Sequence, residues 1–418
     1  MLLRRVAIPL LLIGASVLVF FGGLEIALRL INYPRTEAKI LCLDGIMGNV
    51  YCPNLNERLD NLYGSTLQVS TNSMGMADRE YPLAKPPGTI RVALLGDSLT
   101  ASLYLPVEQK FKTLWENALT RSLGHPVEIL NFAVDGMGTW EALQMFHLRA
   151  RPFQPDVVIL GFFWGNDTWN NLASRDRGRA NPLKDEYEQP SWLMRTRVAH
   201  RSSIRWMWNN SAAFQFLDIL KTRIQTQRSY ERAQEAAAKS ESSVTEGTSA
   251  GTSAASVSTT SASTSSAPAA VAVSPAPALP ATQPKPHYDP GYAWDSEAWR
   301  LTRELMLKLK AETQAAGSAL LVFQLPMLAQ LRTPRPLPHR ELEEFLAANG
   351  MGNADAFAAL SRLSPQQQRA LYLGDDVHLT AEGHRVFAEA ALPQLELFIR
   401  QRVGGKDTAA NGGVLKKP

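Results

Sequence analysis

The chain is poor in cysteine: of its 418 residues only Cys42 and Cys52 are cysteines, and both come early. Two cysteines with no neighbouring histidine exclude the usual kind of structural zinc site. In an oxidising compartment this pair, which closes a short loop, can form a disulfide; the alternative is two free thiols in a connecting segment. The sequence also lacks a stripe of arginine and lysine interleaved with aromatics, and its net charge is only +4. We therefore expect no nucleic-acid partner.

One long apolar run stands at the N-terminus, directly after Arg4 and Arg5. It can cross a bilayer if Glu25 and Arg29, which lie towards its end, sit near the far interface. Two arginines ahead of the run predict a cytoplasmic N-terminus, with the rest of the chain outside. No small-x-small cleavage site follows, which favours an uncleaved anchor at 1–35 over a cleaved signal peptide. The predicted location is the inner (cytoplasmic) membrane, single-pass, with the bulk of the chain in the periplasm.

Four apolar runs further along predict buried strands, at Ile90–Leu95, Val127–Val134, Val157–Trp164 and Ala319–Leu325. Helical patterns lie between them, notably at Glu108–Leu123 and Trp140–Ala150, and a last helix is predicted from about Thr380, as its N-cap, to Val403. Strands that are apolar on both faces and alternate with helices predict an α/β fold with a parallel sheet covered on both sides. In such a sheet, ligands bind at the carboxyl ends of the strands.

Composition divides the rest of the chain. Residues 36–87 are polar and turn-rich, and we expect an extracytoplasmic connecting segment there. The predicted domain, 88–404, is interrupted by a polar and then helical insertion at 168–238, which fits a lid, a membrane-facing helix or a helix packed on the domain. Residues 240–286 are almost entirely Ser, Thr, Ala and Pro, and they cannot bury enough apolar surface to offset their ordering entropy, which predicts disorder. A flexible tail is expected at 405–418.

Ser98 stands at the end of the first predicted strand, in the Gly-Asp-Ser-Leu turn at 96–99, and an Asp375-x-x-His378 pair lies far downstream. A serine hydroxyl is a poor nucleophile unless a base takes its proton, and that base works best when a carboxylate fixes its tautomer. Spacing of three within one turn brings Asp375 and His378 to the same side, whereas the adjacent Asp376 has poorer geometry. These residues predict a serine hydrolase or acyltransferase. The chain lacks G-x-S-x-G and so has no nucleophile elbow of the α/β-hydrolase type.

Two further strand ends carry donors for an oxyanion. Gly136 follows the second predicted strand, and its backbone N–H can point towards the serine. Asn166 follows the third predicted strand, and its side-chain amide offers an N–H donor. Asp97 and Asp167 are expected to support the site; for Asp167 we expect hydrogen bonds to backbone N–H groups of its own loop.

At this point the chain resembles the SGNH family, also called the GDSL family, of esterases and lipases. The four blocks occur in the family's order, with Gly165-Asn166-Asp167 matching Gly-x-Asn-Asp without its intervening residue. The resemblance covers about residues 70–171 and 317–400. It implies a flavodoxin-like three-layer α/β/α domain that needs no metal, and we expect no cofactor. The long insertion between the third and fourth blocks departs from the pattern and leaves the lid and substrate pocket open.

The resemblance also implies site roles. Ser98, His378 and Asp375 would form the catalytic triad, while the Ser98 N–H, the Gly136 N–H and the Asn166 side chain would form the oxyanion hole. The acyl-enzyme would pass its acyl group to water, as an esterase, or to a sugar hydroxyl, as an O-acyltransferase. By analogy and predicted location, the expected substrate is an O-acetyl ester of a cell-envelope or secreted polysaccharide. A lipase or phospholipase at the bilayer, and a non-catalytic glycan-binding or envelope-assembly protein, are the alternatives. No protein partner is indicated.

Overall fold

The computed structural model describes residues 2–31, 40–44, 48–62, 65–176, 181–185, 211–214, 216–217, 220, 293–332, 338–374 and 377–411. The chain divides into two units, of which residues 1–215 and 287–418 form the one that contains the sheet. The predicted disordered tract at 240–286, most of the insertion at 168–238 and the end of the tail lie outside the described residues. Asp375 and Asp376 also lie outside them.

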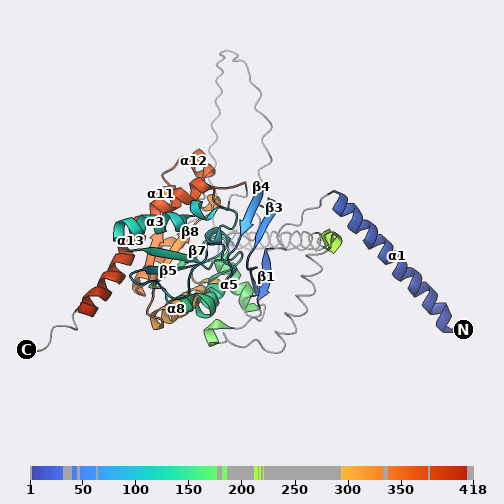
Figure 1. Cartoon of the computed structure of the whole chain (residues 1–418), viewed down its shortest axis with the longest axis horizontal. Coiled ribbons are helices and arrows are strands. Elements are labelled where there is room, and N and C mark those ends of the chain that lie inside the picture. The colour runs from blue at the N-terminus through green and yellow to red at the C-terminus, as the bar shows by residue number, and fades with distance from the viewer. Residues whose placement is uncertain are drawn as a thin grey trace, which may run out of the picture. The chain divides into compact units, whose positions relative to one another are not determined.

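Five parallel strands form the central sheet, in the order β6-β5-β7-β8-β9 (Figure 1). Their bounds are Ile90–Leu95 for β5, Val127–Asn131 for β6, Val157–Phe163 for β7, Ala319–Leu325 for β8 and Gly352–Asp355 for β9. Counted along the chain, this order is 2-1-3-4-5, the flavodoxin-like arrangement. The strand order reverses between β5 and β7, and ligands bind at such a switch point, outside the carboxyl ends of the strands.

Helices cover both faces of this sheet, and alternate side chains of β5, β6, β7 and β8 enter two separate cores. The first core also takes side chains from α4 (Thr139–Met145), α8 (Glu297–Ala315) and α10 (His339–Ala348). The second takes them from α3 (Phe111–Leu123) and α13 (Ala381–Asn411). Figure 1 shows α3 and α13 on one side of the strands and α8 on the other. The prediction of a three-layer α/β/α domain is therefore confirmed.

The remaining elements are short. The shorter helices are α2 (Ser98–Ala101), α5 (Asp167–Asp176), α9 (Leu328–Arg332), α11 (Phe357–Leu360) and α12 (Pro365–Ala370). Single turns of 3₁₀ or π helix cover Val107–Gln109, Phe146–Ala150, Arg151–Phe153 and Pro182–Lys184. Helix α5 takes up the first residues of the stretch at 168–238, and α13 runs past Val403, into the tail that we expected to be flexible.

The described residues of the segment at 36–87 include two antiparallel hairpins. These pair β1 (Leu41–Asp44) with β2 (Gly48–Tyr51), and β3 (Asn56–Leu62) with β4 (Ser65–Ser70). A disulfide joins Cys42 of β1 to Cys52, the residue after β2. Several apolar side chains of this segment are buried in the first core, namely Ile40, Val50, Tyr51, Val69, Met76, Ala77 and Tyr81. The segment at 36–87 therefore contributes to the folded domain rather than only tethering it.

Helix α1 (Leu2–Leu30) contains the only described helix span long and apolar enough to cross a membrane, Leu11–Leu30. At 1.5 Å per residue its 20 residues reach about 30 Å, the thickness of a bilayer's hydrocarbon core. Arg29 and Glu25, one turn apart, form an ion pair of 2.6 Å near the end of this span. Pairing of the two charges lowers the cost of holding them near a membrane interface. A signal sequence has the same length and composition.

Candidate active site

Ser98 begins α2, directly after the tight turn that ends β5. Gly96 has φ +150°, a conformation that favours glycine, and a Cβ there would lie 2.4 Å from Thr100 Oγ1 and 2.9 Å from the Gly161 carbonyl oxygen. No larger residue fits between the turn and strand β7 at this point. Asp97 is the N-cap of α2, and its Oδ1 accepts a hydrogen bond from the Leu99 N–H at 3.0 Å. The turn therefore places Ser98 at the carboxyl edge of the sheet.

The Gly136 loop lies beside the serine turn. The Val134 N–H donates to the Gly96 carbonyl at 3.1 Å, so this loop continues the pairing of β6 with β5. Gly136 itself has φ +72°, in the left-handed region that favours glycine. Across the loop, the Asn170 side chain donates to the Gly136 carbonyl at 3.4 Å. Because Asn170 belongs to α5, this contact links the second block to the third.

Asn166 lies between β7 and α5. Because β5 stands between β6 and β7, the loops that carry Ser98, Gly136 and Asn166 leave neighbouring strands at the same edge of the sheet. Asn166 is partly buried, and its carbonyl oxygen Oδ1 has no hydrogen-bond partner among the described residues. The topology thus gathers the first three blocks, as their positions at predicted strand ends led us to expect.

His378 reaches the serine from the loop between α12 and α13. Its Nε2 lies 3.0 Å from Ser98 Oγ, although the two residues are 280 positions apart. The His378 carbonyl accepts from the Leu373 N–H at 2.7 Å, and the imidazole packs edge-on against the Tyr104 ring. Tyr104 in turn donates its hydroxyl to the Leu379 carbonyl at 3.0 Å. The imidazole is therefore held within hydrogen-bonding reach of a half-buried hydroxyl.

A second serine–histidine pair, Ser102 and His384, lies inside the core and serves as a structural comparison. Ser102 Oγ lies 3.0 Å from His384 Nε2, but both residues are completely buried. The Phe111 N–H donates to His384 Nδ1, so the proton is on Nε2 and points at the hydroxyl. Ser102 gives its own proton to the Leu99 carbonyl at 2.7 Å. Burial, with the charge of Lys110, lowers the pKa of His384 to about 3, so this histidine stays neutral and structural.

Two carboxyl groups are buried beneath the serine turn. Asp97 Oδ2 and Asp167 Oδ1 have no hydrogen-bond partner among the described residues, while Asp167 Oδ2 accepts from the Phe163 N–H at 3.1 Å. Burial raises the pKa of Asp97 to about 7, although the Leu99 N–H opposes the shift. Burial and the charge of Asp97 raise the pKa of Asp167 well above its ordinary value. The bond from Phe163 ties Asp167, at the start of α5, to the end of β7; a loop-holding role for Asp167 stays a prediction.

This burial predicts a falling stability with rising pH. An unfolded chain loses the Asp97 proton near pH 3.8, whereas the folded protein keeps it until about pH 7. Between these values the folded state binds more protons, so the free energy of unfolding decreases as the pH rises. We expect Asp97→Asn to remove this part of the slope, because the amide does not ionise. Urea unfolding of the full chain in detergent at pH 5 and 7.5 measures how the free energy of unfolding changes with pH. An equal change in the unaltered chain and in Asp97→Asn contradicts the raised pKa of Asp97.

Tyr51 is a site neighbour that no local signal in the sequence reveals. Its hydroxyl donates to the carboxylate of Asp135, and the Asp135 N–H donates back to that hydroxyl at 3.3 Å. Asp135 directly precedes Gly136, so the disulfide-linked hairpin touches the loop that carries a candidate oxyanion donor. The contact joins residues 84 positions apart, and only the fold brings them together.

The fold and this site define a flavodoxin-like α/β protein with a serine–histidine pair at its topological switch point. No family model matches the chain. No curated protein matches it either. Similar solved structures include an acetyl xylan esterase from Geobacillus stearothermophilus (11% identity, TM-score 0.35), which covers 73% of this chain and 94% of its own. A GDSL-like lipase from Bacteroides thetaiotaomicron is 11% identical with a TM-score of 0.32, and the match covers 74% of this chain and 88% of the lipase. A psychrotrophic esterase from Pseudoalteromonas sp. is 9% identical with a TM-score of 0.35, and the match covers 74% of this chain and 98% of the esterase. Similarity this low carries no argument about activity.

Proposed function

We propose that the protein is a serine hydrolase that cleaves carboxylic esters through an acyl-enzyme. The observation that carries the proposal is the 3.0 Å approach of Ser98 Oγ and His378 Nε2 at the carboxyl edge of the sheet. In the first step His378 takes the hydroxyl proton while Ser98 attacks the ester carbonyl. The imidazolium then protonates the departing alcohol, and water, activated by the same imidazole, releases the acid.

Further residues complete the proposed site. The backbone N–H groups of Ser98 and Gly136 and the side chain of Asn166 would stabilise the tetrahedral oxyanion, because donors fixed in a water-poor site stabilise developing charge. Asp375 would orient the His378 ring and stabilise its imidazolium, as its spacing in the sequence suggests. Asp97, within the same turn, caps the N-terminus of α2.

The proposed substrate is an O-acetyl ester of a cell-envelope or secreted polysaccharide. Two features support a location of the folded domain outside the cytoplasm. Arg4 and Arg5 precede an apolar helix, which favours a domain outside the cytoplasmic membrane. The disulfide between Cys42 and Cys52 is of a kind that persists in oxidising compartments such as the periplasm. Together they support a single-pass protein of the inner membrane whose folded domain meets extracytoplasmic esters.

A fluorophosphonate probe tests the proposed nucleophile, because it reacts far faster with an activated serine than with an ordinary hydroxyl. The full chain in detergent should carry one adduct, located on Ser98 by mass spectrometry, and should hydrolyse p-nitrophenyl acetate. Ser98→Ala should lose both properties. Ser102→Ala is the matched control, since it removes a second serine that faces an imidazole among the described residues, and we expect it to label like the unaltered chain. An adduct that persists in Ser98→Ala, or no adduct on the unaltered chain, contradicts the proposal.

A further inference from the structure

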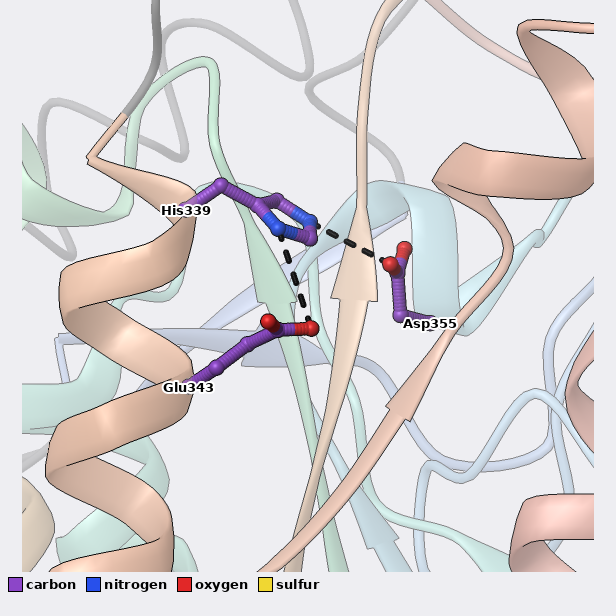
Figure 2. Close-up of side chains that lie close together, drawn as sticks. All are labelled: His339, Glu343 and Asp355. Atoms are coloured by element: carbon purple, nitrogen blue, oxygen red, sulfur yellow. Dashed lines mark ion pairs between the residues drawn. The ribbon is translucent and has the colours of Figure 1, made fainter.

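A second cluster of titratable side chains lies away from Ser98. His339 begins α10, Glu343 follows one turn later on the same helix, and Asp355 ends β9 (Figure 2). His339 Nδ1 lies 3.8 Å from Glu343 Oε1, and Nε2 lies 3.3 Å from Asp355 Oδ2. One ligand atom from each residue lies within 4.8 Å of the other two. Helix and strand thus bring one imidazole and two carboxylates together.

The charge of this cluster is unbalanced. Neither Glu343 nor Asp355 forms an ion pair with a lysine or arginine in the part of the chain that the structure describes; the basic side chain near each of them is His339. With a neutral imidazole the cluster carries two negative charges side by side. The site therefore attracts a cation, which is either a proton or a metal ion.

Surrounding residues hold the three side chains in place. The Phe357 N–H donates to Asp355 Oδ1 at 2.6 Å, which leaves Oδ2 facing the imidazole. The Asn353 amide donates to Glu343 Oε1 at 3.3 Å. The Trp164 ring stacks on His339, with ring centres 5.6 Å apart. Such partners fix the orientation of metal ligands in known sites.

The site also has an open ligand atom and a route of entry. His339 Nε2 is buried and makes no hydrogen bond, despite its proximity to Asp355. Glu343 is 45% exposed, so an ion can enter from its side and the carboxylate can adjust. Nitrogen and oxygen ligands of a tetrahedral zinc ion lie about 3.3–3.5 Å apart. The separation of Nε2 from Asp355 Oδ2 already has this value. Glu343 faces the other ring nitrogen, Nδ1, and its carboxylate, within 4.8 Å of the other two ligand atoms, has to move towards Nε2 to join them.

We propose that His339, Glu343 and Asp355 bind a zinc ion, with water completing its coordination. Imidazole and carboxylate are ligands that zinc accepts, and a three-residue set leaves one position for water. The ion would join the start of α10 to the end of β9. It would also hold the His339 ring against Trp164, which lies two residues before Asn166. It takes no part in the serine chemistry, so its presence is independent of the proposed esterase function. Zinc competes with a proton for His339, so its binding should weaken as the pH falls.

Calorimetric titration of the untagged full chain in detergent tests this site, with zinc chloride alone as the ligand after prior treatment with a chelator. We expect one equivalent of zinc to bind at pH 7.5. At pH 5.5 the affinity for zinc should be at least tenfold lower. His339→Asn and Glu343→Gln should each weaken binding at least tenfold; the half-exposed Glu343 keeps the test valid if the first variant does not fold. Cobalt, as a spectroscopic substitute, should give visible absorption bands that both variants lose.

His147→Asn is the matched control, because His147 also faces a carboxylate, Glu312, at 3.3 Å but lies outside the three-residue cluster. It should bind zinc like the unaltered chain. No heat of binding at pH 7.5, or equal affinity in the unaltered chain and both cluster variants, overturns the proposal. Equal weakening in His147→Asn also overturns it, since that result indicates non-specific binding to surface histidines.

Discussion

Replacing His378 with alanine should lower kcat/KM for p-nitrophenyl acetate by roughly 10⁴-fold or more, because it removes the proposed base that takes the Ser98 proton. The loss should appear in kcat, since the imidazole acts on the transition state and makes no contact that binds the ground state alone. Steady-state kinetics of the full chain in detergent measure both constants. A kcat/KM within tenfold of the unaltered chain contradicts the role of His378.

His384 provides the contrast that separates chemistry from folding. Its two ring nitrogens are bonded to Ser102 and Phe111 inside the core, so His384→Ala leaves the buried Phe111 N–H without its acceptor and removes one of the two partners of the Ser102 hydroxyl. We expect that variant to unfold at lower urea concentration, while its folded fraction keeps a near-normal kcat. His378→Ala should show the opposite pattern, with activity lost and the urea midpoint little changed. If both variants lose activity only in proportion to lost stability, the 3.0 Å contact of His378 with Ser98 has no catalytic meaning.

The sequence predicted the parts of the fold that rest on continuous apolar runs. Strands β5 and β8 match the predicted bounds, and β6 and β7 begin where expected. Strand β6 ends three residues early because Asn131 turns the chain: its Oδ1 accepts from the Ala133 N–H and its amide donates to the Thr100 carbonyl. Strand β9 was missed because Gly-Asn-Ala-Asp has no apolar run, and its place depends on pairing with β8.

Local motifs located the chemical residues, but contacts between distant segments escaped sequence reasoning. The Gly-Asp-Ser-Leu turn and the Asp-x-x-His pair can be found in a sequence because each is short. The cluster at His339 is different, since Asp355 comes from a strand that was not predicted. Tyr51 likewise belongs to a segment whose turn-rich composition suggested a connector, although its side chain is buried in the first core.

The largest expected loss of stability concerns a buried ion pair that ties this same segment to the sheet. Lys112 Nζ donates to Asp78 Oδ1 at 2.6 Å, and both side chains are at most 1% exposed. Asp78 Oδ2 accepts from the Asn131 N–H at 3.1 Å, at the end of β6. The carboxylate therefore bridges the segment at 36–87 to the strand beside the serine turn, with Lys112 as its counterion.

Lys112→Met should lower the free energy of unfolding by about 3–5 kcal/mol, because it leaves the Asp78 carboxylate buried without a partner of opposite charge. Methionine is one atom shorter than lysine but fills the space of its apolar stem, so the loss reports the charge and the hydrogen bonds of Nζ rather than a large cavity. The double variant Lys112→Met, Asp78→Asn should recover part of the loss, since no uncompensated charge remains. Arg385→Met is the surface control: Arg385 pairs with Glu382 and Glu389 in solvent, and we expect almost no change.

Urea unfolding of the four proteins in detergent, followed by tryptophan fluorescence, measures these differences. Because the Asn131 side chain also donates to the carbonyls of Thr100 and Ala101, both in α2, loosening Asp78 should disturb the serine turn before global unfolding. Esterase activity of Lys112→Met should therefore fall at lower urea concentration than its fluorescence changes. A Lys112→Met protein as stable as Arg385→Met contradicts the pair's role, and coincident loss of activity and fluorescence contradicts the link from the connecting segment to Ser98.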